Sequence, residues 1–157
     1  MSLYVDANVL VRLYLQLPGH RGIFDQISIK SARAAWPLPV TDLLRFEVTN
    51  AIHRMVFESR AGGQWRVTSE SAALGLAEFS QHEEQGVFLR RCPLALAELE
   101  PEFISMATRY TPKLGFRTYD ILHVASAVVL RAERFISLDA KANELARLVG
   151  MATSFGE

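Results

Sequence analysis

Four acidic residues that are far apart in the sequence stand where carboxylates could act together: Asp6, Glu47, Asp120 and Asp139. Carboxylates about 5 Å apart repel one another by about 3 kcal/mol per pair at an effective dielectric constant of about 20. A cluster of four would therefore need protons or bound cations to be stable. A ligand set made only of oxygen suits hard divalent ions such as Mg²⁺ or Mn²⁺ better than zinc. If the four residues meet in the fold, they favour the chemistry of a hard-metal site.

Each of these carboxylates also has an ordinary structural explanation. Asp6 and Asp139 each stand between an expected strand and an expected helix, where aspartate often caps the helix. Asp120 falls in the first turn of a helix, where a negative charge favours the helix dipole. Glu47 lies beside the apolar stripe of its helix rather than opposite it, and a glutamate there needs a cation or a hydrogen-bond donor. The sequence alone leaves both explanations open.

The elements that must position these residues follow from hydrophobic periodicity and from turn signals. Strands are predicted at 3–5, 38–40 and 134–138, with a possible strand at 87–89. Helices are predicted at 8–15, 23–35, 41–59 (capped by Thr41 and Asp42), 69–85, 101–110, 119–131 (capped by Thr118) and 140–149. Such alternation predicts a mostly parallel sheet with helices on both faces. Ligands bind outside the carboxyl ends of such strands, and Asp6 and Asp139 are both expected there.

The composition predicts one globular domain spanning residues 1–157. Half of the residues are apolar, and the formal net charge is zero. A protein that holds nucleic acid by phosphate neutralisation alone is usually more basic, but this argument weighs less against an enzyme that contacts RNA through a metal. Cys92 is the sole cysteine, which excludes an intrachain disulfide and a cysteine zinc site. Without a basic leader followed by an apolar run, or an apolar stretch long enough to span a bilayer, we expect a cytoplasmic protein with no membrane partner.

Four segments resemble the acidic blocks of PIN domains, in the same order along the chain. They are LYVDANVL (3–10), VTDLLRFEVTNA (40–51), RTYDILHVASA (117–127) and FISLD (135–139). The last block has Ser137 where threonine is commoner in the family, and a serine hydroxyl can make the same hydrogen bond. The resemblance covers nearly the whole chain apart from residues 63–116. It implies a single domain with a three-layer α/β/α sandwich around a mostly parallel central sheet, and a metal-dependent endoribonuclease most like the VapC-type toxins.

The resemblance also implies a role for each residue. The catalytic residues, which would bind one or two Mg²⁺ or Mn²⁺ ions, are Asp6, Glu47, Asp120 and Asp139. Asn8 and Ser137 would orient the ligands or the attacking water. Arg117 would contact RNA phosphate or neutralise the cluster. His123 is expected to be packed and hydrogen-bonded rather than a catalytic base. The implied reaction is hydrolysis of a phosphodiester by metal-activated water, which leaves a 5′ phosphate.

Partners and competing functions follow from the same comparison. VapC-type toxins imply an RNA substrate, a cognate VapB-type antitoxin and a homodimer. One alternative is a non-catalytic PIN scaffold that binds RNA or protein, although all four acidic positions are filled here. Another is a haloacid-dehalogenase-like phosphatase, whose nucleophilic aspartate normally has a second aspartate two positions later. Asn8 stands at that position here, and no convincing downstream lysine follows it.

Overall fold

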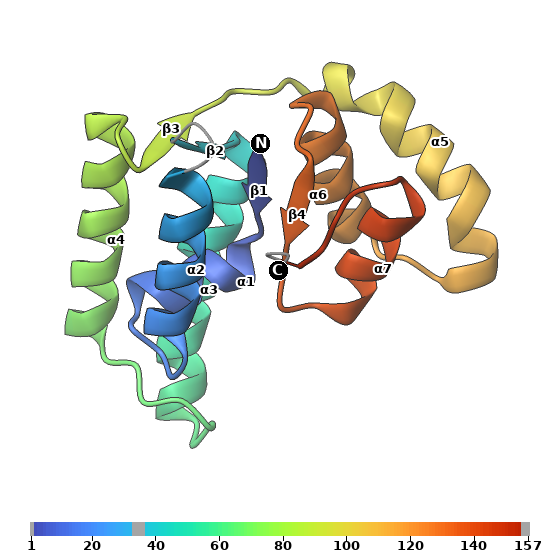
Figure 1. Cartoon of the computed structure of the whole chain (residues 1–157). Helices are drawn as coiled ribbons and strands as arrows, with labels where there is room; N and C mark the ends of the chain where they lie inside the picture. Colours follow the sequence, from blue (N-terminus) through green and yellow to red (C-terminus); the bar gives the residue numbers. More distant parts are fainter. Residues whose placement is uncertain (1, 33–36, 155–157) are drawn as a thin grey trace.

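Short strands alternate with longer helices along the chain (Figure 1). The computed structural model describes residues 2–32 and 37–154. Its strands are β1 (Leu3–Val5), β2 (Leu38–Val40), β3 (Leu89–Arg91) and β4 (Arg134–Ile136). Its helices are α1 (Ala7–Tyr14), α2 (His20–Ala32), α3 (Asp42–Arg60), α4 (Ser69–Gln85), α5 (Leu96–Leu114), α6 (Thr118–Val129) and α7 (Ala140–Leu148). None of the helices in these described ranges combines the length and apolar content needed to cross a membrane.

The strands are parallel, as the alternation predicted. β1 pairs with β4 and β2 pairs with β3, so the described strands form two sheets of two strands each. β1 also packs against β2. The mixed α/β class with parallel strands is confirmed, whereas the single central sheet of a three-layer sandwich is not. A physical reason is that strands of three residues offer few ladder hydrogen bonds and leave little room to extend the pairing.

The pairing of β1 with β4 joins the two ends of the sequence. Val5 lies opposite Ile136, and the backbone N–H of Asp6 donates to the carbonyl of Ile136 at 2.9 Å. Because the two strands are parallel, their carboxyl ends meet at one edge. This register places Asp6 beside Ser137 and thereby begins the site.

Helices pack on both sides of the β1–β4 pair. In Figure 1, α1 to α4 (blue to green) lie on one side and α5 to α7 (yellow to red) lie on the other. Tyr4 and Phe135 are fully buried between them, with their rings stacked at a centroid distance of 5.7 Å. Burying an aromatic side chain of this kind contributes about 1.5–3 kcal/mol. The two strands that lead to Asp6 and Asp139 are therefore anchored in the core.

Several predicted boundaries are confirmed. β2 and α4 begin and end where the sequence predicted. Thr41 caps α3, its hydroxyl accepting from the backbone N–H of Leu44 at 3.1 Å. Asp139 caps α7 and accepts from the N–H groups of Lys141 and Ala142. The ordinary capping explanation of this aspartate is therefore correct, and it does not exclude a second role.

Other boundaries were predicted wrongly. The helix expected from residue 101 begins at Leu96, because the Glu98 carboxylate accepts from the backbone N–H of Ala95 at 2.7 Å and starts the helix before Pro101. The capping residue of α6 is Arg117 rather than Thr118, which is the first helical residue. β3 begins at Leu89 and β4 ends at Ile136, each two residues away from the predicted boundary. α2 begins at His20, and the predicted end of this helix, residues 33–35, lies outside the described residues.

Candidate functional site

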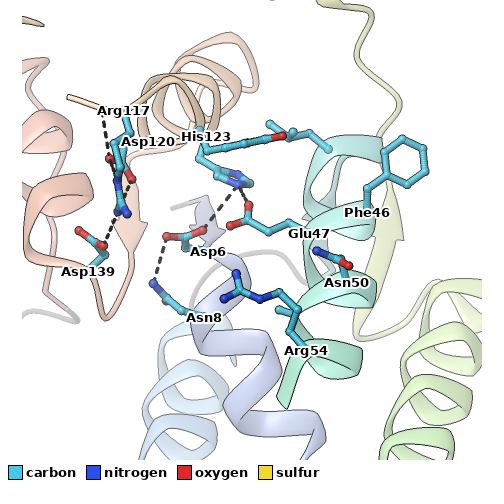
Figure 2. Close-up of a pocket in the computed structure, with 13 residues that line it drawn as sticks. Asp6, Asn8, Phe46, Glu47, Asn50, Arg54, Arg117, Asp120, His123 and Asp139 are labelled. Carbon is cyan, nitrogen blue, oxygen red and sulfur yellow. Dashed lines mark hydrogen bonds and ion pairs between the residues drawn. The ribbon is translucent and has the colours of Figure 1, made fainter. Parts of the chain in front are cut away.

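All four predicted carboxylates line one cavity of about 550 Å³ at the carboxyl ends of β1 and β4 (Figure 2). Asn8, Arg117 and His123 line the same cavity. α3 forms one wall, and α6 with the segment that precedes it forms the opposite wall, as Figure 2 shows. The fold thus brings together acidic residues from positions 6, 47, 120 and 139.

Asp6 is buried, and hydrogen bonds fix its carboxylate. Its Oδ1 accepts from the backbone N–H of Ala7 at 2.7 Å, and its Oδ2 accepts from the Ser137 hydroxyl at 2.7 Å. Burial raises the pKa of Asp6, and the positive charge of His123 together with these hydrogen bonds offsets the rise only in part. Asp6 is therefore an oriented ligand whose negative charge would be stabilised further by a cation.

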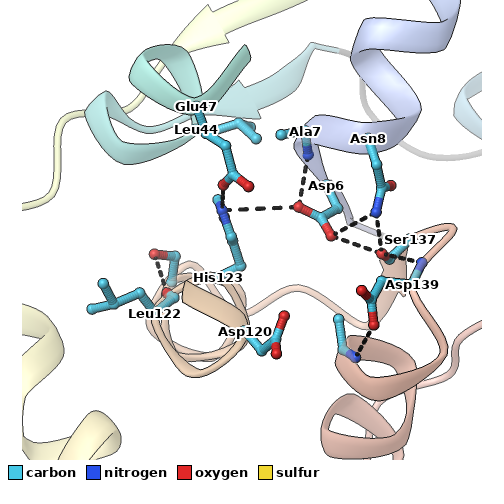
Figure 3. A network of polar contacts seen from close by, with 12 residues as sticks. Asp6, Ala7, Asn8, Leu44, Glu47, Asp120, Leu122, His123, Ser137 and Asp139 are labelled. Atoms are coloured by element: carbon cyan, nitrogen blue, oxygen red, sulfur yellow. Dashed lines mark hydrogen bonds and ion pairs between the residues drawn. The ribbon is translucent and has the colours of Figure 1, made fainter. Parts of the chain in front are cut away.

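Ser137 and Asn8 form a small hydrogen-bond network behind the carboxylates (Figure 3). The Asn8 side-chain amide donates to the Ser137 Oγ at 3.0 Å, and the Asn8 Oδ1 accepts from the backbone N–H of Leu138 at 3.0 Å. The Ser137 Oγ also accepts from the backbone N–H of Asp139 at 3.0 Å. One hydroxyl thus links Asp6 to the backbone of Asp139, as expected of an orienting residue. Ser137 stands behind the cavity and does not line it.

Glu47 reaches the site from α3 and meets His123 from α6. The His123 Nε2 hydrogen-bonds the Glu47 carboxylate and lies 3.9 Å from the Asp6 Oδ1. Its Nδ1 pairs with the buried Tyr4 hydroxyl at 2.8 Å. Burial lowers the pKa of His123, but the hydrogen bond to Glu47 and the neighbouring carboxylates outweigh burial, and the net shift is upward. His123 therefore lies between Glu47 and Asp6, and the upward shift of its pKa favours the charged imidazolium.

Asp120 and Asp139 are held together in a different way. The Arg117 guanidinium donates from Nε to the Asp120 Oδ2 at 3.1 Å and from Nη2 to the Asp139 Oδ2 at 3.0 Å. The Arg117 side chain is 71% exposed, whereas that of Asp120 is 10% exposed. The hydrogen bond to Asp120, followed by the charges of both aspartates, raises the pKa of Arg117. An exposed arginine therefore bridges this second pair.

The donor set fits a hard divalent cation. Oxygens from four carboxylates face one cavity, and Asp6 is already oriented by neutral donors. Ligand atoms of Asp6, Glu47 and His123 all lie within 4.8 Å of one another and could hold an ion. That mixed oxygen and nitrogen set does not by itself select Mg²⁺ or Mn²⁺. Asp120 and Asp139 are outside this group of three, and they add only oxygen atoms to the lining of the cavity.

Sequence reasoning did not identify every residue at the site. His123 is packed and hydrogen-bonded, as expected, but it also bridges two of the predicted ligands. Phe46, Asn50, Arg54 and Tyr119 line the cavity as well. A signal was present, because each lies within two turns of a predicted ligand on the same helix. Helical spacing could therefore have placed them near the acidic residues.

Comparison of the sequence with protein-family models and with curated proteins finds no match. Any assignment of function therefore depends on the geometry of this cavity and on the residues that line it.

Proposed function

We propose that this chain is a metal-dependent endoribonuclease of the PIN-domain kind, acting as the VapC-type toxin of a toxin–antitoxin pair. One observation carries the proposal: carboxylates from four separate segments line one cavity at the carboxyl ends of two parallel strands. A cluster of this kind is costly to maintain unless positive charges compensate it, and a bound divalent cation would add to the compensation that His123 and Arg117 supply. The order of the four acidic blocks supports the PIN-domain form of the proposal.

In the proposed reaction, a water oxygen attacks the phosphorus of an RNA phosphodiester. The bond from phosphorus to the 3′ oxygen breaks, and the 3′ oxygen takes up a proton, leaving a 3′ hydroxyl and a 5′ phosphate. Bound Mg²⁺ or Mn²⁺ would lower the pKa of the attacking water and neutralise charge on the phosphate. The protein would hold the ions with Asp6, Glu47, Asp120 and Asp139.

Other residues in and behind the cavity orient or neutralise these ligands. Ser137 and Asn8 fix the direction of the Asp6 carboxylate through hydrogen bonds of 2.7 and 3.4 Å. His123 positions Glu47, whose own side chain is 38% exposed and lines the cavity. Arg117 neutralises the charges of Asp120 and Asp139. Each contact acts on a ligand of the site rather than on the reacting atoms.

The finer structural and cellular features belong to the same proposal. We infer a single PIN-like domain with a three-layer α/β/α arrangement, in which the contact between β1 and β2 would join the two strand pairs. We also infer a homodimer in the cytoplasm and inhibition by a VapB-type antitoxin. The support for these inferences is the resemblance of the four acidic blocks to PIN domains.

A non-catalytic PIN scaffold is the second candidate, and a specific observation favours it. His123 and Arg117 already neutralise the two carboxylate pairs without any metal. A protein that never bound an ion could keep its acidic residues in this way. Titration calorimetry with Mn²⁺ separates the two candidates, because the scaffold would show no specific heat of binding.

Cleavage of labelled RNA tests the proposed activity. We expect cutting in Mg²⁺ or Mn²⁺ and none in EDTA, with a loss of at least about 100-fold in Asp6→Asn and Asp120→Asn. Asp42→Asn is the matched control, because Asp42 lies at the start of α3 outside the cavity and pairs with Arg91 at 3.4 Å. Circular dichroism would show that each variant is folded. Cleavage that survives EDTA, or full activity in both cavity variants, would overturn the assignment.

A further inference from the structure

Two large aromatic side chains line the acidic cavity while remaining exposed. Phe46 on α3 is 65% exposed and Tyr119 on α6 is 62% exposed. A single exposed aromatic residue is common on protein surfaces and requires no explanation. Two of them on the walls of the same polar cavity are less easily explained by chance. Neither has a part in the metal chemistry proposed above.

Their positions tie them to the proposed ligands. Phe46 immediately precedes Glu47, and Tyr119 immediately precedes Asp120. The hydrogen bond between Glu47 and His123 joins α3 to α6, so the two aromatic residues belong to walls that meet at the acidic cluster. Figure 2 shows the Phe46 ring at the outer edge of the α3 wall, on the side of the helix that faces away from the Glu47 carboxylate. An RNA strand that extends from the carboxylates over the rim of the cavity could reach these rings.

The charges that line the cavity offer little attraction for the phosphates of RNA. The cavity-lining arginines are both engaged by acids: Arg54 lies 3.2 Å from Glu58, and Arg117 bridges Asp120 and Asp139. The net charge of the chain is zero. Phosphate neutralisation, the usual source of affinity for nucleic acid, is therefore weak here. Stacking of bases on aromatic side chains is the other general source, and it works with any base.

We propose that Phe46 and Tyr119 are substrate-positioning residues that stack on bases flanking the phosphate to be cut. This inference depends on the proposed ribonuclease function and adds the means by which the strand is held in register. Bases in a duplex are already stacked and cannot present their faces to these rings. The two residues therefore select unpaired nucleotides at the point of cleavage.

Fluorescence anisotropy with a labelled 12-nucleotide single-stranded RNA tests the proposal. Wild type, Phe46→Ala, Tyr119→Ala and the double variant are titrated in EDTA, and again in Mn²⁺ with Asp139→Asn added to stop cleavage. We expect each alanine variant to weaken binding by about 5-fold or more and the double variant to weaken it further. Phe46→Trp should keep near wild-type affinity. An RNA duplex of the same length should bind weakly to every variant.

Phe57→Ala is the matched control, because Phe57 lies on the same helix, is 72% exposed and does not line the cavity. Equal affinities of Phe46→Ala, Tyr119→Ala and Phe57→Ala for RNA would overturn the stacking proposal. A loss of self-association on sedimentation, with RNA binding unchanged, would overturn it too and would assign the rings to a subunit interface.

The failure of stacking can be distinguished from failure of the nuclease. If wild type cuts RNA but the aromatic variants bind RNA as tightly as wild type, the proposed ribonuclease function is supported and the stacking proposal is overturned. If no metal supports cutting but binding still depends on Phe46 and Tyr119, stacking stands and the nuclease fails. If wild-type protein binds no RNA in either buffer, both are overturned.

Discussion

In each half of the acidic cavity, a basic side chain lies between two carboxylates that would otherwise repel each other, and the basic side chain differs between the halves. On one side, His123 bridges Glu47 and Asp6 from within the core, with its side chain only 4% exposed. On the other, Arg117 bridges Asp120 and Asp139 from the surface. Both bridges supply a positive charge between two carboxylates, and they differ in how firmly they are held.

This difference indicates which half could change when an ion binds. His123 is fixed at both ring nitrogens, by Glu47 and by Tyr4, so it cannot leave without breaking buried contacts. Arg117 follows the left-handed Gly115 that ends α5, and its side chain has solvent on most sides. An ion arriving at Asp120 and Asp139 would compete with Arg117, whereas one arriving at Asp6 would add to a rigid frame.

The largest effect is expected from removing the buried bridge. His123→Ala leaves Asp6 and Glu47 without their shared cation, and we expect the free energy of unfolding in EDTA to fall by about 2–3 kcal/mol. Glu47 is 38% exposed, so the loss should be below that for a fully buried pair. Chemical denaturation measures this change. Tyr4→Phe, which removes the bond to Nδ1 and leaves the bridge, should cost about 1 kcal/mol. Equal losses in the two variants would show that the bridge itself contributes little.

A second prediction concerns Ser137, the residue that connects the two halves. Ser137→Ala removes the donor to Asp6 and the acceptor for the N–H of Asp139, so both ligands lose orientation. We expect Mn²⁺ affinity or RNA cleavage to fall by about 10–100-fold, the range typical of residues that orient metal ligands. Ser137→Thr keeps the hydroxyl and should retain most activity. A threonine variant as impaired as the alanine variant would point to a steric effect rather than to the lost hydrogen bonds.

Removing the exposed bridge should have a smaller effect, and on metal binding it should act in the opposite direction. Arg117→Ala should change the unfolding free energy by less than about 1 kcal/mol, because exposed ion pairs contribute little. It should tighten Mn²⁺ binding by about 3–10-fold, since the competing guanidinium is gone, and titration calorimetry measures this. Arg54→Ala removes the same charge from the same cavity without touching Asp120 or Asp139. Weaker Mn²⁺ binding in Arg117→Ala would show that Arg117 supports the site rather than competing with the ion.

The smallest effect is expected at Glu83, an acidic residue of α4 that lacks a close bridge. Its Oε1 is buried and has no hydrogen-bond partner among the residues that the structure describes, and the Arg45 Nε lies 3.9 Å from its Oε2. Burial raises the pKa of Glu83, and the negative charge of Asp42 adds to the rise. The positive charges of Arg45 and Arg91 offset this rise only in part. At a pH between the ordinary and the raised pKa, Glu83 therefore binds a proton more strongly in the folded protein than in the unfolded chain.

The contribution of Glu83 to the stability of the fold depends on pH, and the upward shift of its pKa sets the sign of that dependence. The stability contributed by the protonated carboxyl is present below its ordinary pKa of 4.5 and is lost as pH rises through the raised value. Glu83→Gln should remove this dependence and stabilise the protein at pH 7 by less than about 1 kcal/mol. Thermal melts between pH 4 and pH 8 measure both effects. An unchanged pH profile in the variant would show that the weak contact with Arg45 is a sufficient bridge.

The sequence by itself determined the positions of the acidic residues relative to the strands and helices. Strand patterns that end before Asp6 and near Asp139 predicted that both carboxylates lie at one edge of parallel strands, and the register of Val5 with Ile136 agrees. Thr41 and Asp139 were recognisable as caps because capping depends on the neighbouring backbone. Features that depend on adjacent residues were therefore readable from the sequence.

The nearness of Arg117 to Asp120 was visible in the sequence, but only the tertiary structure decided that His123 bridges Glu47 and Asp6 and that Arg117 also reaches Asp139. His123 is 76 residues from Glu47 and Arg117 is 22 residues from Asp139, and no local pattern pairs them. The start of α5 was missed for a different, local reason, because the Glu98 contact with the N–H of Ala95, three residues away, outweighed the signal from Pro101. The exposure of Phe46 and Tyr119 depends on which helix faces remain uncovered after packing. Long-range packing sets such contacts, and periodicity along the chain does not encode them.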